Sequence, residues 1–264
     1  SSDVCSSDLA IAEHIGGSVE GFVFLMNQKA RELGMDHTVF SNPHGLDTHE
    51  EHYSTAYDMA LLGAYAMKNE TFVEIVATKR KTVPMPGNAW DRVWYNKNRL
   101  LTMYPYADGI KTGYTKRAGR TLVSSSNKDG HRLIAVTLNA PNDWQDHIAL
   151  YEYGYSRYRQ ATLAQAGETL HHEKLNRKDG QFTYMNTFKY PLQQGEKVRR
   201  KIVLAPAFKE EQIDEPPQPA GFVYFMVNDE VVGRTPIAFQ VREKGSFWFH
   251  FRSILSMMMG AGHG

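Results

Sequence analysis

Residues 120–140, RTLVSSSNKDGHRLIAVTLNA, constrain the fold more than any other part of this 264-residue chain. Two apolar runs flank Asn127-Lys128-Asp129-Gly130, a sequence typical of a tight turn between antiparallel strands. The short segment ADGIKTGYT before this hairpin predicts another strand, and DWQDHIALYEYGYSRY after it has helical spacing. This part of the chain therefore predicts an α+β fold, with helices packed on an antiparallel sheet.

Two helices are expected before the sheet. Residues 10–34 repeat apolar side chains at helical intervals, which predicts one helix ending at Gly34. Ser54 and Thr55 offer an N-cap for a second helix, TAYDMALLGAYAMKN. The loop between them is rich in turn formers, and from Phe72 onward the pattern favours short strands and turns. The repeating apolar positions of the first helix are Ile11, Ile15, Val19, Phe22, Val23, Met26, Ala30 and Leu33.

The composition changes after Arg159. Residues 160–243 hold short alternating runs such as KVRRKIVLA, with a hairpin turn expected at Asn228-Asp229. They predict a separate, small all-β domain that contains the proline-rich loop 210–219.

Residues 244–264 form a third kind of segment. On a helical projection of SFWFHFRSILSMMM, one side collects large apolar side chains, while His250, Arg252 and Ser253 lie on the other. The run is shorter than the roughly 20 residues of a spanning helix, so it predicts an amphipathic helix that lies in a membrane interface. A terminal helix docked on its own domain is the alternative. The side chains expected to enter the membrane are Phe247, Trp248, Phe251, Ile254, Leu255 and Met258.

Charge and cysteine content exclude some function classes. The net charge is +1 and no dense Lys/Arg tract occurs, which argues against nucleic-acid binding. The one cysteine cannot form an internal disulfide, and Cys-x-x-Cys metal patterns are absent from the sequence. We expect no cofactor and no metal.

The chemistry centres on Lys111-Thr112-Gly113-Tyr114, within the short strand expected before the hairpin. The Lys111 ammonium supplies positive charge for a substrate carboxylate, and the Thr112 hydroxyl can donate a hydrogen bond to the same group. Gly113 lacks a side chain, so the backbone of a ligand can approach the strand.

The surrounding residues, DGIKTGYTKRAG, resemble the third active-site motif of the serine D-alanyl-D-alanine carboxypeptidases, which are low-molecular-mass penicillin-binding proteins. The segments FSNPHGLD, YSTAYDMALL and AEHIGGSVEGFVFLMNQKARELGM resemble the same family. The resemblance covers residues 10–159, which we interpret as part of a β-lactamase/transpeptidase-like catalytic domain. The all-β domain and the amphipathic helix follow in the order that the family implies.

The family implies a serine that attacks the penultimate D-Ala carbonyl, forms an acyl-enzyme and releases the terminal D-Ala. That serine belongs to a Ser-x-x-Lys motif, and a Ser-x-Asn motif assists it. The one Ser-x-x-Lys here, Ser125 to Lys128, follows the third motif and is in the wrong place. We therefore interpret the N-terminal part of the domain as missing, with no catalytic residue present and the fragment inactive. Tyr114 stands where many relatives have histidine, a change that we expect to alter substrate contacts.

The first nine residues, SSDVCSSDL, resemble the translation of a sequencing adapter. We interpret them as an artefact fused at the break, upstream of which the parent gene should encode Ser-x-x-Lys and Ser-x-Asn. A natural polar N-terminus is one alternative. The other makes Cys5 a nucleophile and Ser6-Ser7-Asp8 a degenerate Ser-x-Asn, but no base is placed to activate the thiol.

Two further clusters have ordinary explanations. His44, Asp47, His49 and His52 fit no established zinc spacing. Tyr151, Tyr153, Tyr155 and Tyr158 are interpreted as helix packing with some exposed tyrosine, rather than as a carbohydrate platform.

The resemblance implies a parent enzyme on the outer face of the bacterial cytoplasmic membrane, attached there by the C-terminal helix. Its expected partners are peptidoglycan stem peptides ending in D-Ala-D-Ala and β-lactam antibiotics. A β-lactamase-like hydrolase and a non-catalytic cell-wall scaffold are the alternatives.

Overall fold

The structure is a computed structural model that describes residues 6–47, 51–87, 90–172, 180–205 and 219–241. Backbone contacts divide the chain into two compact units, residues 1–157 and 158–264. This division lies two residues before the boundary expected from composition. The assignment of residues 1–9 to an artefact stays a prediction, although helix α1 (Ser6–Gly16) begins inside that segment.

The expectation of a single helix over residues 10–34 is wrong, because the structure has two helices there. Helices α1 and α2 (Val19–Glu32) are bent by 79° at their break. Gly17 has a φ of +74°, and a Cβ on Gly16 would lie 2.3 Å from the backbone nitrogen of Phe22, so the corner requires small residues. Ser18 then caps α2 by accepting a hydrogen bond from the Gly21 amide.

The segment between α2 and the sheet contains two more helices and a hairpin. Helix α3 (Ala56–Ala66) begins after Thr55, whose hydroxyl accepts from the Asp58 amide, which confirms the expected N-cap. Helix α4 (Glu70–Ala77) includes Phe72, so the expectation of short strands and turns from Phe72 onward is wrong up to Ala77 and is confirmed only beyond it. The hairpin of β1 (Arg80–Val83) and β2 (Arg92–Tyr95) follows, and then the short helix α5 (Leu100–Met103).

The expected sheet is present and antiparallel. Strands β3 (Ala107–Thr115), β4 (Gly119–Lys128) and β5 (His131–Leu138) lie in sequence order, so β3 forms an edge of this sheet. The turn between β4 and β5 places Asp129 and Gly130 at φ values of 52° and 81°, as a tight hairpin turn requires. Helix α6 (Asp143–Arg157) follows, as its spacing predicted.

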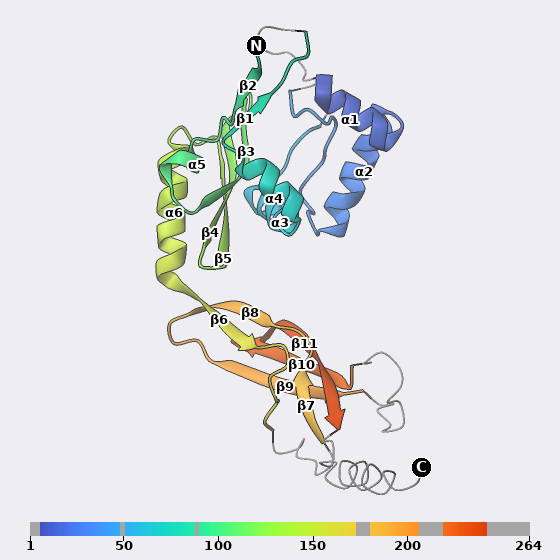
Figure 1. The fold of residues 1–264 in the computed structure, drawn as a ribbon, viewed down its shortest axis with the longest axis vertical. Coiled ribbons are helices and arrows are strands. Elements are labelled where there is room, and N and C mark those ends of the chain that lie inside the picture. The colour runs from blue at the N-terminus through green and yellow to red at the C-terminus, as the bar shows by residue number, and fades with distance from the viewer. Residues whose placement is uncertain (1–5, 48–50, 88–89, 173–179, 206–218, 242–264) are drawn as a thin grey trace, which may run out of the picture. The chain divides into compact units, whose positions relative to one another are not determined.

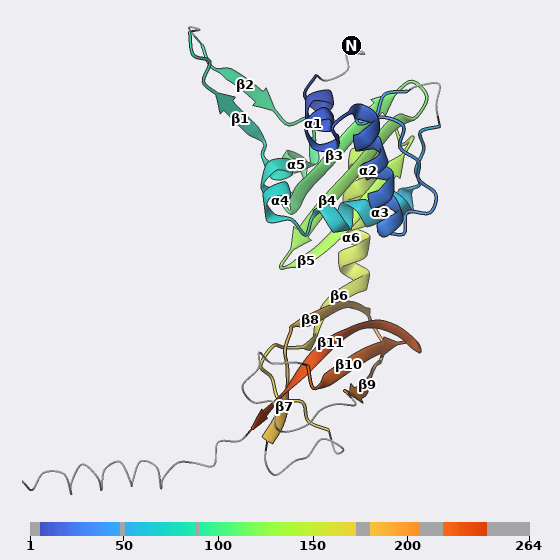
Figure 2. The ribbon, with the colours of Figure 1, turned by 90° about the vertical axis from the view of Figure 1, so that its right-hand side faces the viewer.

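Helices cover both faces of this sheet (Figures 1 and 2). Helices α3 and α4 contact one face, and α6 contacts the other through β4 and β5. Helix α1 packs on α2, while its side chains Ile11 and Ile15 remain exposed, so the expected apolar stripe of residues 10–34 is only partly covered by described residues. The Lys-Thr-Gly segment is therefore carried by an edge strand of a sheet that helices cover on both faces.

The described part of the second unit consists of strands. Strands β7 (Gly180–Tyr184), β11 (Glu230–Val241), β10 (Gly221–Val227) and β9 (Val198–Leu204) form an antiparallel sheet in that order. Strands β6 (Tyr158–Ala164) and β8 (Phe188–Gln193) pair separately. The expected turn at Asn228-Asp229 is confirmed by φ values of 51° and 69°.

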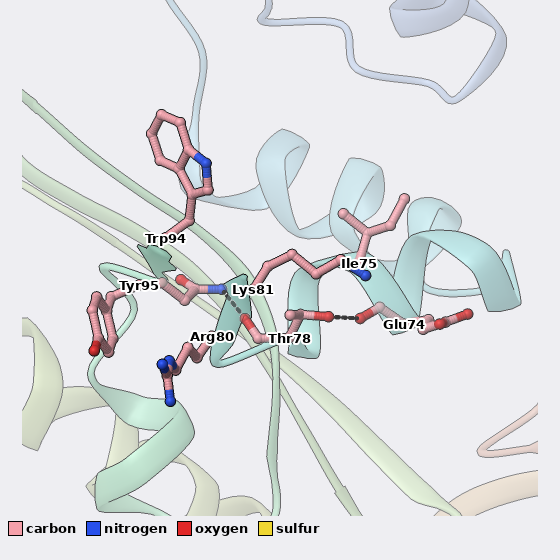
Figure 3. A pocket seen from close by; sticks show the side chains of 8 residues that line it. Glu74, Ile75, Thr78, Arg80, Lys81, Trp94 and Tyr95 are labelled. Atoms are coloured by element: carbon pink, nitrogen blue, oxygen red, sulfur yellow. Dashed lines mark hydrogen bonds between the residues drawn. The ribbon is translucent and has the colours of Figure 1, made fainter. Parts of the chain in front are cut away.

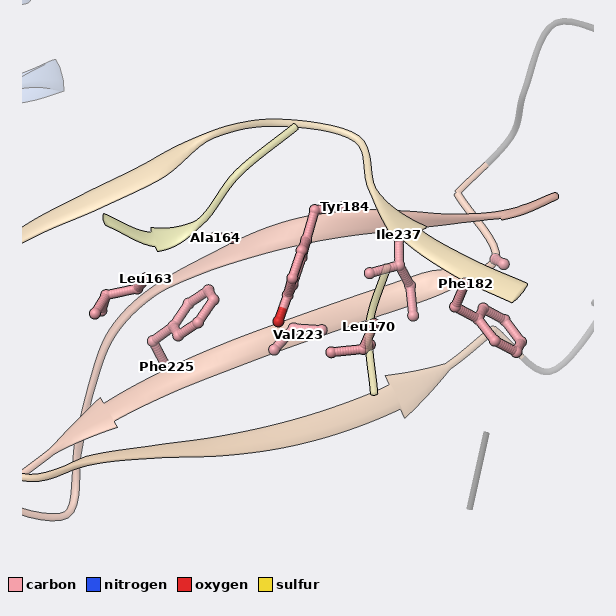
Figure 4. Close-up of a cluster of buried hydrophobic side chains, with 9 residues drawn as sticks. Leu163, Ala164, Leu170, Phe182, Tyr184, Val223, Phe225 and Ile237 are labelled. Carbon is pink, nitrogen blue, oxygen red and sulfur yellow. The ribbon is translucent and has the colours of Figure 1, made fainter. Parts of the chain in front are cut away.

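The core of this unit is apolar and aromatic (Figure 4). Phe225 is fully buried and stacks on Phe188 with ring centroids 5.0 Å apart, which joins the two strand groups. Leu163, Val223 and Ile237 surround these rings. That residues 160–243 as a whole form an all-β domain stays a prediction.

Among the described residues no single helix is long and apolar enough to cross a membrane. Helices α1 and α2 reach that length and composition only together, across their bend. The amphipathic segment 244–264 and most of the proline-rich loop 210–219 lie outside the described residues.

Candidate functional site

The Lys-Thr-Gly segment occupies the middle of β3, at the open edge of the sheet. Lys111 pairs across the sheet with Val123, Thr112 with Leu122, and Gly113 with Thr121. Lys111 and Gly113 therefore share the face that carries Val123, next to Gly63 of α3. No described strand pairs with the other edge of β3, so its backbone groups can pair with an extended ligand.

The polar groups of this segment are available to a ligand. Lys111 is exposed, and its ammonium donates to the carbonyl of Thr112 rather than to a carboxylate. Within the described ranges its ammonium forms no ion pair, and the Thr112 hydroxyl has no hydrogen-bond partner. Tyr114 is 71% exposed at the end of the same strand. The arrangement presents one cation and one hydroxyl group beside a free strand edge.

Gly113 has a packing role that the sequence did not reveal. A Cβ at this position would lie 2.5 Å from the Oγ1 of Thr121 on the neighbouring strand. The absence of a side chain is therefore required by β4, independently of any ligand.

Two polar contacts fix the ends of β3. At its start the Asp108 carboxylate accepts from Arg132 at 2.7 Å, and Arg132 also donates to the carbonyl of Met67 after α3. Beyond its other end, the Arg117 amide donates to the Asp47 carboxylate over 3.4 Å. The second contact brings the loop FSNPHGLD beside the Lys-Thr-Gly strand.

That loop is held by buried side chains. Asn42 is buried, accepts from the Gly45 amide at 2.7 Å and donates to the carbonyl of Leu46 at 3.1 Å. Asn27 of α2 exchanges hydrogen bonds with the backbone of Phe40. The loop thus packs against α2.

The misplaced Ser-x-x-Lys segment cannot act as a nucleophile in this structure. Ser125 and Ser126 are fully buried in β4, where the Ser126 hydroxyl bonds Tyr155 of α6. The Lys128 ammonium lies over the rings of Tyr106 and Tyr155. A buried serine with no access to substrate has a structural role.

A buried serine–histidine pair is not visible in the sequence. The Ser124 hydroxyl lies 2.5 Å from Nδ1 of His147 and 2.5 Å from the Tyr151 hydroxyl, and Thr137 lies 3.0 Å from Nε2 of the same ring. Ser124 and His147 are fully buried between β4 and α6. Burial lowers the pKa of His147 to about 4. These groups form a packed polar layer behind the sheet, closed to substrate.

The comparisons with known proteins decide the family. The family model described as D-alanyl-D-alanine carboxypeptidase (peptidase S11) matches residues 5–142, more than half of the chain. The chain belongs to this family. The match includes the Lys-Thr-Gly strand and the loop beside it.

Individual relatives agree with this family assignment. The D-alanyl-D-alanine carboxypeptidase DacF of Bacillus subtilis is 36% identical over 185 residues, which cover 69% of this chain and 47% of the relative. DacC of Escherichia coli is 36% identical over 165 residues, 61% of this chain and 39% of the relative. The chain thus spans about half the length of the curated relatives it matches, or less.

Solved structures of the carboxypeptidase family also share the fold. Penicillin binding protein 5 from Haemophilus influenzae has a TM-score of 0.63 and 26% identity, covering 89% of this chain and 70% of that one. DacD from Francisella tularensis has a TM-score of 0.58 and 25% identity, covering 92% and 74%. The mixed fold with antiparallel sheets is therefore that of penicillin-binding carboxypeptidases.

The remaining candidates from the sequence have structural roles or were not described. His44 accepts from the Leu46 amide and His52 from the Ser41 amide, so both rings stabilise the loop. Within the described ranges no three potential metal ligands cluster. His49 lies outside those ranges, as does the set Phe247, Trp248, Phe251, Ile254, Leu255 and Met258. Tyr151 is buried and Tyr153 is exposed on α6, as the helix-packing interpretation expected, whereas Tyr158 begins strand β6.

Proposed function

We propose that the whole protein of this carboxypeptidase family removes the terminal D-alanine from peptidoglycan stem peptides through a serine acyl-enzyme. The observation that carries the proposal is the exposed Lys111 ammonium, which pairs with no carboxylate of the described residues, together with the Thr112 hydroxyl group on an edge of β3 that no described strand covers. A stem peptide in extended form would pair with this edge, and its terminal carboxylate would bind Lys111 and Thr112.

The chain supplies positioning and charge rather than the nucleophile. Ser125 and Ser126 are closed to substrate, and the Ser124–His147 pair is buried between β4 and α6. We therefore expect that the 264-residue chain binds the peptide carboxylate without forming an ester. Labelled penicillin tests this on a denaturing gel, because covalent labelling of the chain would contradict the assignment of its serines.

Binding to the β3 edge has its own test. We expect N-acylated peptides ending in D-Ala-D-Ala to shift the backbone amide signals of residues 110–115 in an NMR titration. Lys111→Ala and Thr112→Ala should weaken these shifts, whereas Lys116→Ala, which removes an exposed lysine just beyond the strand, should not. Equal shifts with a peptide whose C-terminus is amidated would refute the carboxylate contact.

The expected upstream motifs distinguish the enzyme from the scaffold alternative. DNA upstream of the AIAEH codons should encode Ser-x-x-Lys followed by Ser-x-Asn, and a gene without Ser-x-x-Lys would favour a scaffold. Comparing hydrolysis of a penicillin with that of a D-Ala-D-Ala peptide by the parent protein separates the carboxypeptidase from a β-lactamase. The relatives reported above favour the carboxypeptidase.

We place the site of action outside the cytoplasmic membrane, with attachment by the amphipathic segment 244–264. Support comes from the cell-wall substrate and from the segregation of apolar side chains in SFWFHFRSILSMMM. In a vesicle-flotation assay, deletion of residues 246–264 should abolish co-flotation. Unchanged flotation would rule out this anchor.

A further inference from the structure

The β1–β2 hairpin is an unusual element of the first unit. Its two strands pair only with each other among the described strands, and all eight of their residues are exposed. Figure 2 shows the hairpin extending away from the three-stranded sheet. A two-stranded hairpin gains little stability by itself.

The register sorts the side chains onto two faces. Lys81 lies opposite Trp94, and Val83 lies opposite Arg92, so these four residues share one face. Trp94 is 56% exposed, and Val83 is exposed beside it. We call this set the Lys81–Trp94 face. It combines a flat apolar ring and an aliphatic side chain with two cations.

The cations on this face are held ready for an anion. The Arg92 guanidinium lies 5.5 Å from the centroid of the Trp94 ring. Stacking orients the guanidinium plane and leaves its N–H groups free at the edge. In the part of the chain that the structure describes, neither Arg92 nor Lys81 pairs with a carboxylate. Both cations therefore remain able to bind an anion directly.

A hollow adjoins the base of this face (Figure 3). Its volume is about 390 Å³, and Lys81 and Trp94 line it together with Glu74 and Ile75 of α4. Figure 3 shows Lys81 reaching toward Ile75, while the Trp94 ring projects from the neighbouring strand. Lys111, Thr112 and Gly113 do not line this hollow. The face is thus separate from the proposed peptide site.

We propose that the Lys81–Trp94 face binds an anionic saccharide of the bacterial wall. The Trp94 ring would stack on the apolar face of a sugar, and Lys81 and Arg92 would bind its phosphate or carboxylate groups. The choice of a wall saccharide rests on the proposed function, but the binding uses no residue of β3. The hairpin would hold the protein on its polymeric substrate while the β3 edge engages individual stem peptides.

The test uses the 264-residue chain and sedimentation with purified Bacillus subtilis sacculi. One batch keeps its phosphate polymers, and a second is stripped of them with hydrofluoric acid. Binding to intact sacculi alone identifies phosphate as the anion, and equal binding to both identifies the carboxylates of peptidoglycan. Complete competition by a DNA oligonucleotide at equal charge would mean unspecific attraction and would overturn the proposal.

The variants have closely matched controls in the same unit. Arg157 lies 5.4 Å from the ring centroid of Tyr153, which is 55% exposed, so this pair copies Arg92 and Trp94 elsewhere on the surface. We expect Trp94→Ala, and Lys81→Gln combined with Arg92→Gln, each to weaken binding by about tenfold. Tyr153→Ala and Arg157→Gln should leave it unchanged.

Absence of binding by the unmodified chain, or equal losses in the controls, would overturn the proposal. The altered side chains are exposed, so circular dichroism should show the same fold for all variants. The D-Ala-D-Ala peptide titration of β3 should be unaffected by Trp94→Ala. This independence separates failure of the saccharide site from failure of the proposed function.

Discussion

Acid should destabilise the first unit through His147. The ring is fully buried, and burial lowers its pKa to about 4 in the folded protein. In the unfolded chain the ring takes up a proton near the usual histidine pKa of about 6.5. Between these two values the unfolded chain binds one more proton than the folded protein, so stability falls as the pH falls.

The size of this effect follows from the difference between the two pKa values. Each pH unit between them changes the free energy of unfolding by about 1.4 kcal/mol. Lowering the pH from about 6.5 to about 4 should therefore remove up to about 3 kcal/mol. Above about pH 6.5 this contribution is fully present.

Urea unfolding at a series of pH values measures the effect. Tryptophan fluorescence reports mainly on this unit, because Trp90, Trp94 and Trp144 belong to it. His147→Gln keeps an amide that can bond the neighbouring hydroxyl groups but cannot titrate, so its stability should depend less steeply on pH, by about 1.4 kcal/mol per unit. His14→Gln, which removes an exposed histidine, is the control. An unchanged slope in His147→Gln would refute the reasoning.

Three further substitutions test the packing. Gly113→Ala should destabilise the sheet by about 1–3 kcal/mol because its Cβ meets Thr121, and adding Thr121→Ala should restore part of the melting temperature; a double variant no better than the single one contradicts this contact. Asp143→Asn should lower the free energy of unfolding, measured in urea, by about 1–2 kcal/mol. The loss should be no larger because the partner side chain, Arg120, is 42% exposed and water can hydrate its guanidinium. Phe225→Ala should cost about 3–5 kcal/mol and abolish amide-exchange protection in the second unit only, whereas equal loss in both units would contradict the two-unit division.

The predictions that succeeded depend on local chemistry. Asp129-Gly130 determines its own turn, because few other residue pairs adopt positive φ at both positions. Thr55 caps α3 with its own hydroxyl, and Gly34 at a φ of +73° follows the end of α2. Such signals act within a few residues and are visible in the sequence.

The features that were missed depend on residues far apart in the chain. The contact of Ser124 with His147 spans 23 positions, and the clash that explains Gly113 comes from the next strand. Helix α4 was read as strand because a run of eight residues fits either structure until its N-cap, Asn69, is recognised. The corner between α1 and α2 was missed because the apolar repeat continues across Gly17.

The hydrogen bonds between β4 and α6 also fix the position of the helix along the strand. Ser124 and Ser126 are two residues apart on β4, a distance of about 6.7 Å, while their partners Tyr151 and Tyr155 are four apart on α6, about 6 Å. The spacing of two strand residues therefore matches that of four helix residues for two successive Ser–Tyr pairs. A longer series of pairs would lose this match. A slide of α6 by one turn would leave a buried hydroxyl without its partner, so the helix has one permitted position along the strand. Apolar packing alone would tolerate such a slide, and the spacing of two serines and two tyrosines forbids it.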